Sequence, residues 1–370
     1  MAQRLLGSLS PASFLRRHWQ KQPLFVRNAM PQCGSWVQRE TLFDLACRDE
    51  VESRVVTRTN NRWRVAHGPF TRQGLRQLPA RNWTLLVQGV EQFLPDASAL
   101  LQQFSFIPHA RLDDLMVSYA APGGGVGPHF DSYDVFLLQG AGKRRWRISS
   151  QKDLALIDNA PLRILKNFRP RQAWDVETGD LLYLPPRYAH DGVASTGCMT
   201  LSVGFRTPRK LELASNFLNF LQDNLKIDGL IEDAGLPLQR HPAQLPSFLI
   251  GRFSRVLNSL RWNAADVRHF AGCYLTEPKP QVVFKRPRRA LTPESFVKRL
   301  MKRGIGLALP TRMLYGGKHV FINGERYSMA NAQRDVLVRL ADTRASRPFV
   351  PNAATAQLTY NWYRAGYVDV

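Results

Sequence analysis

The residues most suited to chemistry lie in the run Gly123–Phe136, which carries a histidine and an aspartate two positions apart, His129 and Asp131. On a strand these two side chains would share one face, because side chains alternate along an extended chain. A third candidate ligand is His190, which follows a strand-like run ended by Pro185-Pro186. Two imidazoles and one carboxylate on one face form the triad of non-haem Fe(II) oxygenases, which leaves open positions for a cosubstrate and dioxygen.

Each of these observations has an ordinary alternative. An HxD triplet also arises by chance, and a single histidine more often lies in a core or on a surface than on a metal. The glycines at 123–125 resemble a phosphate loop, but no GK[ST] ending and no helical pattern follows them. We interpret them instead as positions that allow positive φ and a close approach to the metal-binding strand.

An oxygenase of this type also needs a cation for the distal carboxylate of 2-oxoglutarate. Lys143, Arg144, Arg145 and Arg147 begin a strand-like run after the turn at 140–142. Arginine suits a carboxylate because its guanidinium donates two parallel hydrogen bonds. Periodicity does not choose between Arg144 on one face and Lys143 with Arg145 on the other, and a solvated basic edge is the alternative for most of them.

The residues around these candidates predict a β-rich core. Short apolar runs separated by Gly and Pro turns indicate strands and favour an antiparallel barrel or jelly roll; they are Met116–Ala120, Tyr133–Leu138, Arg145–Ile148, Leu181–Leu184 and Met199–Phe205. Before this core, Ser10-Pro11 predicts a helix start, Lys21–Arg27 a strand, and Val51–Val65 a hairpin with Asn60-Asn61 at its tip.

The pattern becomes helical after Thr207-Pro208. Helices are predicted at Leu211–Leu225, Pro246–Arg261, Ala264–Cys273, from Thr292-Pro293, at Ala332–Thr343 and at Gln357–Ala365. The proline-rich basic run Glu277–Arg289 is interpreted as a linker or an arm. His319–Tyr327 predicts a hairpin, since Asn323-Gly324 suits a type I′ turn. Helices beside a small hairpin resemble a winged helix.

Charge and cysteine content limit the function classes. The net charge is +22, and residues 208–370 hold 25 basic against 12 acidic side chains, which favours an anionic partner such as RNA or a ribonucleoprotein. The four cysteines are far apart, so we expect neither a disulfide framework nor a structural zinc site. No run suits a membrane span or an export signal, so we expect a cytoplasmic protein without a membrane contact.

Beyond these patterns, the chain resembles the JmjC group of Fe(II)/2-oxoglutarate oxygenases, and more closely the bacterial ribosomal-protein hydroxylases or ribosomal oxygenases. The resemblance lies in SPASFLRRHWQKQPLFVRNA, in IPHARLDDLMVSYAAPGGGVGPHFDSYDVFLLQGAGKRRWRI and in GDLLYLPPRYAHDGVAS. It implies an α+β chain with a double-stranded β-helix (cupin or jelly-roll) core, a helical dimerisation segment and a winged-helix-like C-terminal module. We expect boundaries of 1–208 (core about 95–208), 209–276, 277–290 for the linker, and 291–370.

The resemblance also implies the roles of individual residues. Fe(II) would be bound by His129, Asp131 and His190, and 2-oxoglutarate by Arg144 and the hydroxyl of Ser118, with dioxygen as the second cosubstrate. The implied activity is a hydroxylation of an arginine Cβ in a large-subunit ribosomal protein, with release of succinate and CO2, by a homodimer. Tyr133 and Asp134 are candidates for substrate contacts, although barrel packing and turn hydrogen bonds would explain both.

Three other interpretations remain open at this point. The oxygenase could act on a ribosomal histidine, on a histone or on RNA such as tRNA. A metal-binding cupin could instead catalyse isomerisation or hydrolysis and would need neither Arg144 nor 2-oxoglutarate. A ribosome- or RNA-binding protein with a vestigial barrel would use the basic linker and the C-terminal module, although a complete triad argues against a vestigial site.

Overall fold

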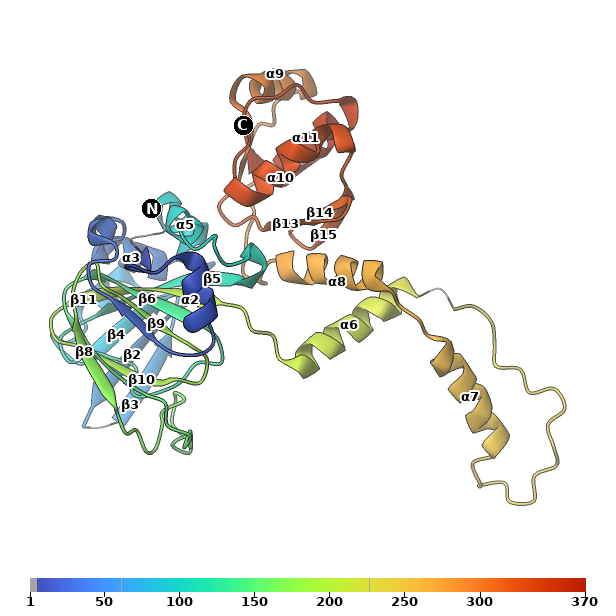
Figure 1. Cartoon of the computed structure of the whole chain (residues 1–370), viewed down its shortest axis with the longest axis horizontal. Helices are drawn as coiled ribbons and strands as arrows, with labels where there is room; N and C mark the ends of the chain where they lie inside the picture. The colour runs from blue at the N-terminus through green and yellow to red at the C-terminus, as the bar shows by residue number, and fades with distance from the viewer. Residues whose placement is uncertain (1–4, 61, 226) are drawn as a thin grey trace.

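The computed structural model describes residues 5–60, 62–225 and 227–370, so Asn61 of the expected hairpin tip lies outside the described residues. Figure 1 shows a β-rich N-terminal part, a helical segment that extends away from it, and a C-terminal module of helices and short strands. The helix α2 (Pro11–Arg17) begins where the sequence predicts, and the Ser10 hydroxyl caps it by accepting a hydrogen bond from Ser13 N at 3.2 Å.

Two antiparallel sheets form the N-terminal part. The larger one follows the order β1 (Leu24–Val26), β9 (Leu181–Leu184), β6 (Val135–Ala141), β11 (Cys198–Phe205), β5 (Leu112–Ala120), β4 (Trp83–Val87), β2 (Ser53–Thr59) and β3 (Arg62–His67). The smaller one consists of β10 (Ala189–Ala194), β7 (Arg144–Ser149) and β8 (Gln172–Val176). This arrangement confirms the expected jelly roll.

The alternation of side chains in the large sheet separates a core from a cavity. On β5, Leu115 and Val117 are fully buried, whereas Met116 and Ser118 line a cavity between the sheets. The core face is aromatic, and the rings of Phe136 and Tyr183 lie 4.8 Å apart. The N-terminal part also contains three helices, α3 (Arg39–Ala46), α4 (Arg72–Arg76) and α5 (Pro95–Gln102). Its 3-10 turns are Pro31–Ser35, Val90–Gln92 and His109–Arg111.

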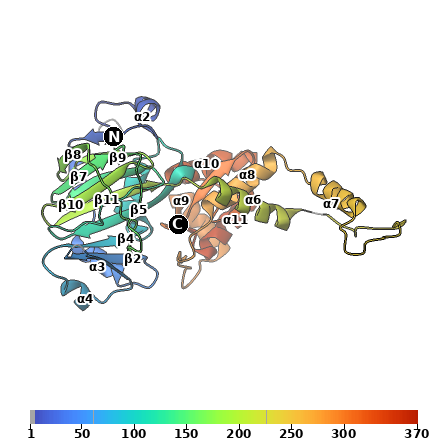
Figure 2. The ribbon, with the colours of Figure 1, turned by 90° about the horizontal axis from the view of Figure 1, so that it is seen from below.

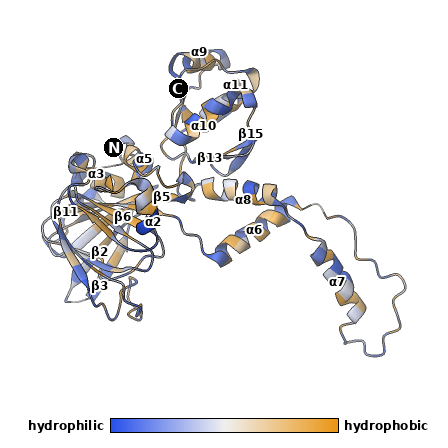
Figure 3. Ribbon diagram, in the orientation of Figure 1, coloured by the Kyte–Doolittle hydropathy of each residue, from blue (hydrophilic) through white to orange (hydrophobic). Residues whose placement is uncertain are grey.

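The helical segment consists of α6 (Lys210–Asn224), α7 (Ser247–Ser259) and α8 (Ala264–Thr276), all close to their predicted ranges. Figures 1 and 2 both show α6 and α7 projecting from the rest of the chain, and these two helices together are called the projecting arm. Figure 3 shows apolar and polar residues alternating along α6 and α7. Within the described residues, no helix is long and apolar enough to cross a membrane.

The C-terminal module has its own hydrophobic core around Phe296, Leu300 and Trp362. Its elements are α9 (Pro293–Arg303), β12 (Gly306–Leu307), β13 (Met313–Gly316), β14 (His319–Ile322), β15 (Glu325–Ser328), a 3-10 turn (Asn331–Gln333), α10 (Arg334–Thr343), α11 (Ala353–Ala365) and β16 (Val368–Asp369). The predicted Asn323-Gly324 turn joins β14 to β15, and both of its residues have positive φ, 50° and 88°.

In the two sheets of the N-terminal part, the sequence patterns missed three strands. β4 is buried at every position, so it has no alternation, and β8 is mostly exposed. β10 reads AHDGVA, which combines a glycine with polar residues and has low β propensity. It forms a strand because it pairs with β7 along its whole length.

Candidate active site

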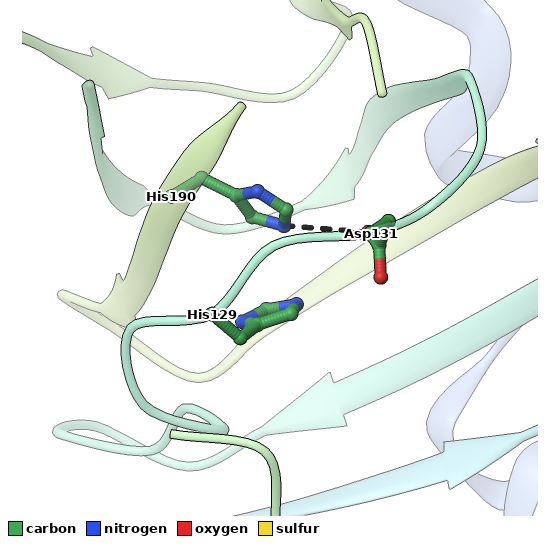
Figure 4. A group of neighbouring side chains, drawn as sticks. All are labelled: His129, Asp131 and His190. Carbon is green, nitrogen blue, oxygen red and sulfur yellow. Dashed lines mark ion pairs between the residues drawn. The ribbon is translucent and has the colours of Figure 1, made fainter. Parts of the chain in front are cut away.

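The loop before β6 carries His129 and Asp131 to the edge of β10, where His190 lies. His129 and His190 form an isolated antiparallel bridge, with His129 N donating to His190 O at 2.9 Å and His190 N donating to His129 O at 2.8 Å. The expectation that one strand carries both His129 and Asp131 is wrong, because β6 begins only at Val135. The loop nevertheless aims both side chains at His190 (Figure 4).

The three side chains offer a compact set of donor atoms. One ligand atom from each of them lies within 4.8 Å of the other two. His190 Nε2 is 3.5 Å from Asp131 Oδ2, and the two imidazole rings are 4.2 Å apart. Such distances suit joint coordination of one metal ion, and the donor set of two imidazoles and a carboxylate fits Fe(II).

Hydrogen bonds to the backbone orient both imidazoles. His129 Nδ1 lies 2.9 Å from Gly127 O, and His190 Nδ1 lies 2.9 Å from Tyr188 O. A carbonyl only accepts, so each Nδ1 carries the proton and each Nε2 keeps its lone pair for a metal. Burial, aided by the nearby His129, lowers the pKa of His190 to about 4, which keeps this imidazole neutral.

The glycines before His129 bring the loop against β10. Gly123 N donates to Ala194 O and Ala194 N donates to Gly124 O, both at 2.8 Å. A Cβ at Gly125 would lie 2.6 Å from Gly192 O, and Gly123 has a φ of +78°. These positions therefore require glycine for close approach and for positive φ, as the sequence interpretation expected.

The triad faces a cavity of about 700 Å³ between the two sheets. One wall comes from the large sheet and includes Met116, Ser118 and Thr200, and the other comes from the small sheet and includes Arg144 and Trp146. The cavity therefore extends from the metal ligands along both sheets, which leaves room for a cosubstrate and for part of a substrate.

Arg144 differs from the other basic residues of β7 in having no anion beside it. Its side chain is buried and lines the cavity, and among the described residues its Nε and Nη2 have no hydrogen-bond partner. Buried guanidinium nitrogens without a hydrogen-bond acceptor are costly, so this geometry fits the carboxylate of a bound ligand such as 2-oxoglutarate. Ser118, whose hydroxyl is 3.5 Å from Thr200 O, lines the same cavity.

The neighbours of Arg144 point to the outside and pair with acids. Lys143 Nζ lies 2.7 Å from Glu177 Oε1, Arg145 lies 3.1 Å from Asp175 Oδ2, and Arg147 pairs with Asp191. The alternation of β7 thus separates the one buried cation from a basic edge, which periodicity alone left open.

The two candidates for substrate contacts lie in different environments. Tyr133 is partly exposed and lines the cavity. Asp134 is completely buried outside it, where its carboxylate accepts hydrogen bonds from Tyr183 Oη at 2.6 Å and Gln20 Nε2 at 2.9 Å. The substrate role expected for Asp134 is therefore not supported, since its oxygens are engaged in the barrel core.

Sequence reasoning missed several charged residues of the cavity wall, among them Asp114 and Lys279. Asp114 had a signal, because it alternates with Met116 and Ser118 on one face of β5. Lys279 had none, because it lies in the linker and reaches the barrel only through the tertiary fold. Its Nζ lies 3.3 Å from Asp114 Oδ2 and 3.4 Å from Asp113 Oδ1.

Comparison with known families identifies two parts of the chain. Residues 99–213 match the JmjC domain, and residues 259–368 match the ROXA-like winged helix. Among solved structures, the ribosomal oxygenase YcfD from Escherichia coli in complex with cobalt and 2-oxoglutarate aligns with a TM-score of 0.82 and 30% sequence identity over 98% of both chains.

Curated relatives carry related names. The chain is 32% identical to the ribosomal protein uL16 3-hydroxylase of Escherichia coli over 323 residues, which cover 86% of each chain. It is 40% identical to a probable ribosomal oxygenase of Haemophilus influenzae over 204 residues, 54% of this chain and 50% of that one. The chain therefore belongs to the ribosomal oxygenases, JmjC enzymes that depend on iron and 2-oxoglutarate.

Proposed function

We propose that this oxygenase hydroxylates an arginine Cβ of a large-subunit ribosomal protein. The observation that carries the oxidative chemistry is the buried guanidinium of Arg144, whose Nε and Nη2 have no hydrogen-bond partner among the described residues, in the cavity of the His129–Asp131–His190 triad. A cupin that catalyses isomerisation or hydrolysis would have no use for it, and the cost of burying it would remain uncompensated.

In this proposal the chain positions the reactants and the bound groups supply the oxidation. His129, Asp131 and His190 hold Fe(II), while Arg144 and Ser118 hold the distal carboxylate of 2-oxoglutarate. Iron with 2-oxoglutarate and dioxygen supplies the oxidising power, and succinate and CO2 are released. The cavity wall shields His190, which is only 2% exposed, from water.

The cavity supports a cationic substrate side chain. Asp114 lines it with a carboxylate, and Tyr133 adds an aromatic ring near the metal ligands. A guanidinium pairs with a carboxylate through parallel hydrogen bonds and stacks on an aromatic ring, so both groups suit arginine. The E. coli relative's name, ribosomal protein uL16 3-hydroxylase, supports the same substrate class.

Asp114 also bears on the choice between an arginine and a histidine substrate. A neutral histidine side chain would form no ion pair with the carboxylate of Asp114, which Lys279 already contacts at 3.3 Å.

We further propose the expected organisation: an oxygenase part at 1–208, a helical dimerisation segment at 209–276, a linker at 277–290 and a winged-helix-like module at 291–370. The family match at 99–213 supports the end of the oxygenase part. The winged-helix match at 259–368 begins earlier than the proposed last module and includes α8, which packs on it through the hydrogen bond from Gly324 N to Thr276 Oγ1 at 3.0 Å. A ribosomal substrate would place the enzyme in the cytoplasm.

A second copy of the chain is the proposed partner of the projecting arm. Leu211, Leu218 and Leu257 are 79%, 61% and 64% exposed on α6 and α7, although both helices are amphipathic. Covering such a face would remove this apolar area from water. Two identical arms can pair through the same face, as in most homodimers.

The test is mass spectrometry of ribosomal proteins from cells with and without the enzyme. A +16 Da shift on one arginine that disappears in the deletion strain, and that purified enzyme restores with equimolar succinate, would support the proposal. A shift on histidine or on RNA would contradict the arginine assignment, and succinate formation with no hydroxylated ribosomal protein would contradict the substrate class.

A further inference from the structure

The C-terminal module carries a shallow basic groove, far in sequence from the metal ligands. The groove has a volume of about 510 Å³ and is lined by Arg286, Arg288, Arg364 and Asn361, with Pro287, Ala290 and Ala365 between them. We propose that this groove binds the phosphate backbone of RNA and so docks the enzyme on ribosomal RNA. The proposed function is used only to name the source of the RNA.

The three arginines are available for a ligand. All of them are exposed. Among the described residues of this module, the ion pairs involve Lys279 and Arg312, which reach Asp113 and Asp114 of the barrel, and none involves the groove arginines. Three guanidiniums around one groove without a carboxylate therefore form a concentrated positive field that only an external anion neutralises.

The groove has fixed walls because the linker is held against α11 at both ends. On one side the rings of Phe284 and Tyr367 lie 4.8 Å apart. On the other side Tyr360 Oη donates to Leu291 O at 2.8 Å, and Leu291 N donates to Tyr363 Oη at 3.3 Å. The arginines of the linker and of α11 thus project from two anchored segments, and little ordering is needed when a ligand binds.

Two of the last carbonyl groups of α11 accept hydrogen bonds, so the C-terminal end of this helix does not repel an anion strongly. Gly366 N donates to Tyr363 O at 3.0 Å and Tyr367 N donates to Trp362 O at 2.8 Å. Gly366 has a φ of +81°, and a Cβ there would lie 2.7 Å from Lys285 O. Glycine at this position lets the linker pass close to the helix end, and Arg364 in the last turn further offsets the helix dipole.

A second basic surface lies on the neighbouring helix. Lys298, Arg299, Lys302 and Arg303 are exposed on α9, while Phe296 on its other face lies 5.3 Å from the ring of Tyr363 in α11. Residues 277–370 contain 17 basic and 6 acidic side chains, a net charge of +11. The module that carries the groove is thus strongly basic, as expected for a protein part that binds a polyanion.

RNA fits this surface better than the other candidates. A ribosomal protein is usually basic itself, so the substrate proposed for the cavity does not complement a positive groove. The anionic surface beside a ribosomal protein is ribosomal RNA, and arginine matches phosphate through its planar donors. An acidic protein would supply carboxylates instead, and it becomes an outcome of the test.

The test measures binding of a fluorescently labelled RNA of about 20 nucleotides to the full chain by anisotropy, over a series of salt concentrations. The variant changes Arg286→Ala, Arg288→Ala and Arg364→Ala together. The control changes Arg17→Ala, Arg81→Ala and Lys152→Ala, three exposed cations of the N-terminal part, so that both proteins lose the same charge. Conversion of 2-oxoglutarate is measured in all three proteins as a check of the oxygenase.

We expect the wild type to bind with a steep salt dependence, and the groove variant to lose roughly tenfold or more in affinity and about two units of the log–log salt slope, near 0.7 per phosphate contact. The control should change affinity less than about threefold, since its charges lie elsewhere. Unchanged 2-oxoglutarate conversion in the groove variant would show that its loss of RNA binding is separate from the oxygenase function.

Three results would overturn the inference. Equal losses in the two variants would show attraction by net charge and not by the groove. If polyglutamate, at the same concentration of negative charges, competes as well as unlabelled RNA, the partner would be an acidic protein. Tighter binding of DNA of the same sequence would exclude RNA as the partner. Absence of binding by the wild type at low salt would also reject the groove as an RNA site.

Discussion

Lys279 of the linker places its Nζ 3.3 Å from Oδ2 of Asp114 on β5, in the wall of the cavity that contains the metal ligands. Asp113 joins this pair, and Arg312 of the C-terminal module hydrogen-bonds to Leu112 O and Asp113 O. Lys279 of the linker therefore completes the cavity wall that the barrel begins, while Arg312 of the C-terminal module holds the start of β5. Burial raises the pKa of Asp114, and the ammonium of Lys279 opposes this rise.

The variant Lys279→Met should make substrate binding more sensitive to acid. Without the ammonium the pKa of Asp114 rises further, so the carboxylate that would receive the arginine is protonated at a higher pH. The KM for a ribosomal peptide should exceed that of the wild type at about pH 6 and converge with it or fall below it at about pH 8, because Lys279 no longer competes. Lys143→Met, which changes a lysine paired with Glu177, should have no such effect.

Loss of a metal ligand should abolish oxidation. Asp131→Ala removes one of three donors to the iron, so succinate formation should fall by roughly 100-fold or more, and binding of Co(II) followed by its visible absorption should weaken in parallel. Asp175→Ala, at an exposed carboxylate paired with Arg145, is the control. Wild-type succinate release by Asp131→Ala would refute the assignment.

Arg144→Met should weaken the binding of 2-oxoglutarate in particular. The substitution keeps a long side chain but removes the buried donors, so the KM for 2-oxoglutarate should rise roughly 10- to 100-fold, as for a lost hydrogen bond to a charged group. The peptide KM should stay close to that of the wild type. Arg145→Met tests the opposite face of the same strand, and a larger effect there would transfer the role to the basic edge.

Glu91 should make stability depend on pH. Burial, with a smaller contribution from Asp114, raises the pKa of Glu91 from 4.5 to about 7. Between these two pH values, Glu91 keeps a proton in the folded state that it has lost in the unfolded state. The resulting stabilisation of the folded state is therefore fully present below pH ~4.5 and is lost as the pH rises through ~7. Glu91→Gln keeps an acceptor for Leu115 N and should show a smaller fall in Tm between about pH 6 and pH 8.

The matched control for this measurement is Glu232→Gln, an exposed residue outside the barrel. Its Tm should follow that of the wild type across the same range. If the Tm of Glu91→Gln falls by the same amount as that of the wild type at higher pH, the titration of Glu91 does not contribute to the pH dependence of stability.

The arm should determine the oligomeric state. Leu257→Asp places a charge on the exposed apolar face of α7, so it should convert a dimer to a monomer in light scattering coupled to size exclusion. Val350→Asp changes a residue that is 71% exposed in the C-terminal module and should leave the dimer intact. A wild-type chain that is monomeric at micromolar concentration would contradict the proposed dimer.

The sequence by itself determined the ligand types and most local elements. The side chains of His129, Asp131 and His190 can bind a metal ion wherever the chain places them. The glycines at 123–125 let an irregular loop lie close to a neighbouring strand. The Ser10 cap and the Asn323-Gly324 turn depend on neighbours a few residues away, so their structures were predictable. These features are local, and local physics decides them.

The tertiary structure alone decided which side chains face the cavity. Alternation on β7 defines two faces, but only the packing of the two sheets shows that Arg144 is inside and that Lys143 and Arg145 are outside. Asp134 is withdrawn into the core by Tyr183, a partner 49 positions away, and Lys279 reaches Asp114 across 165 positions. Such contacts depend on strand order and domain packing, which a periodic pattern does not encode.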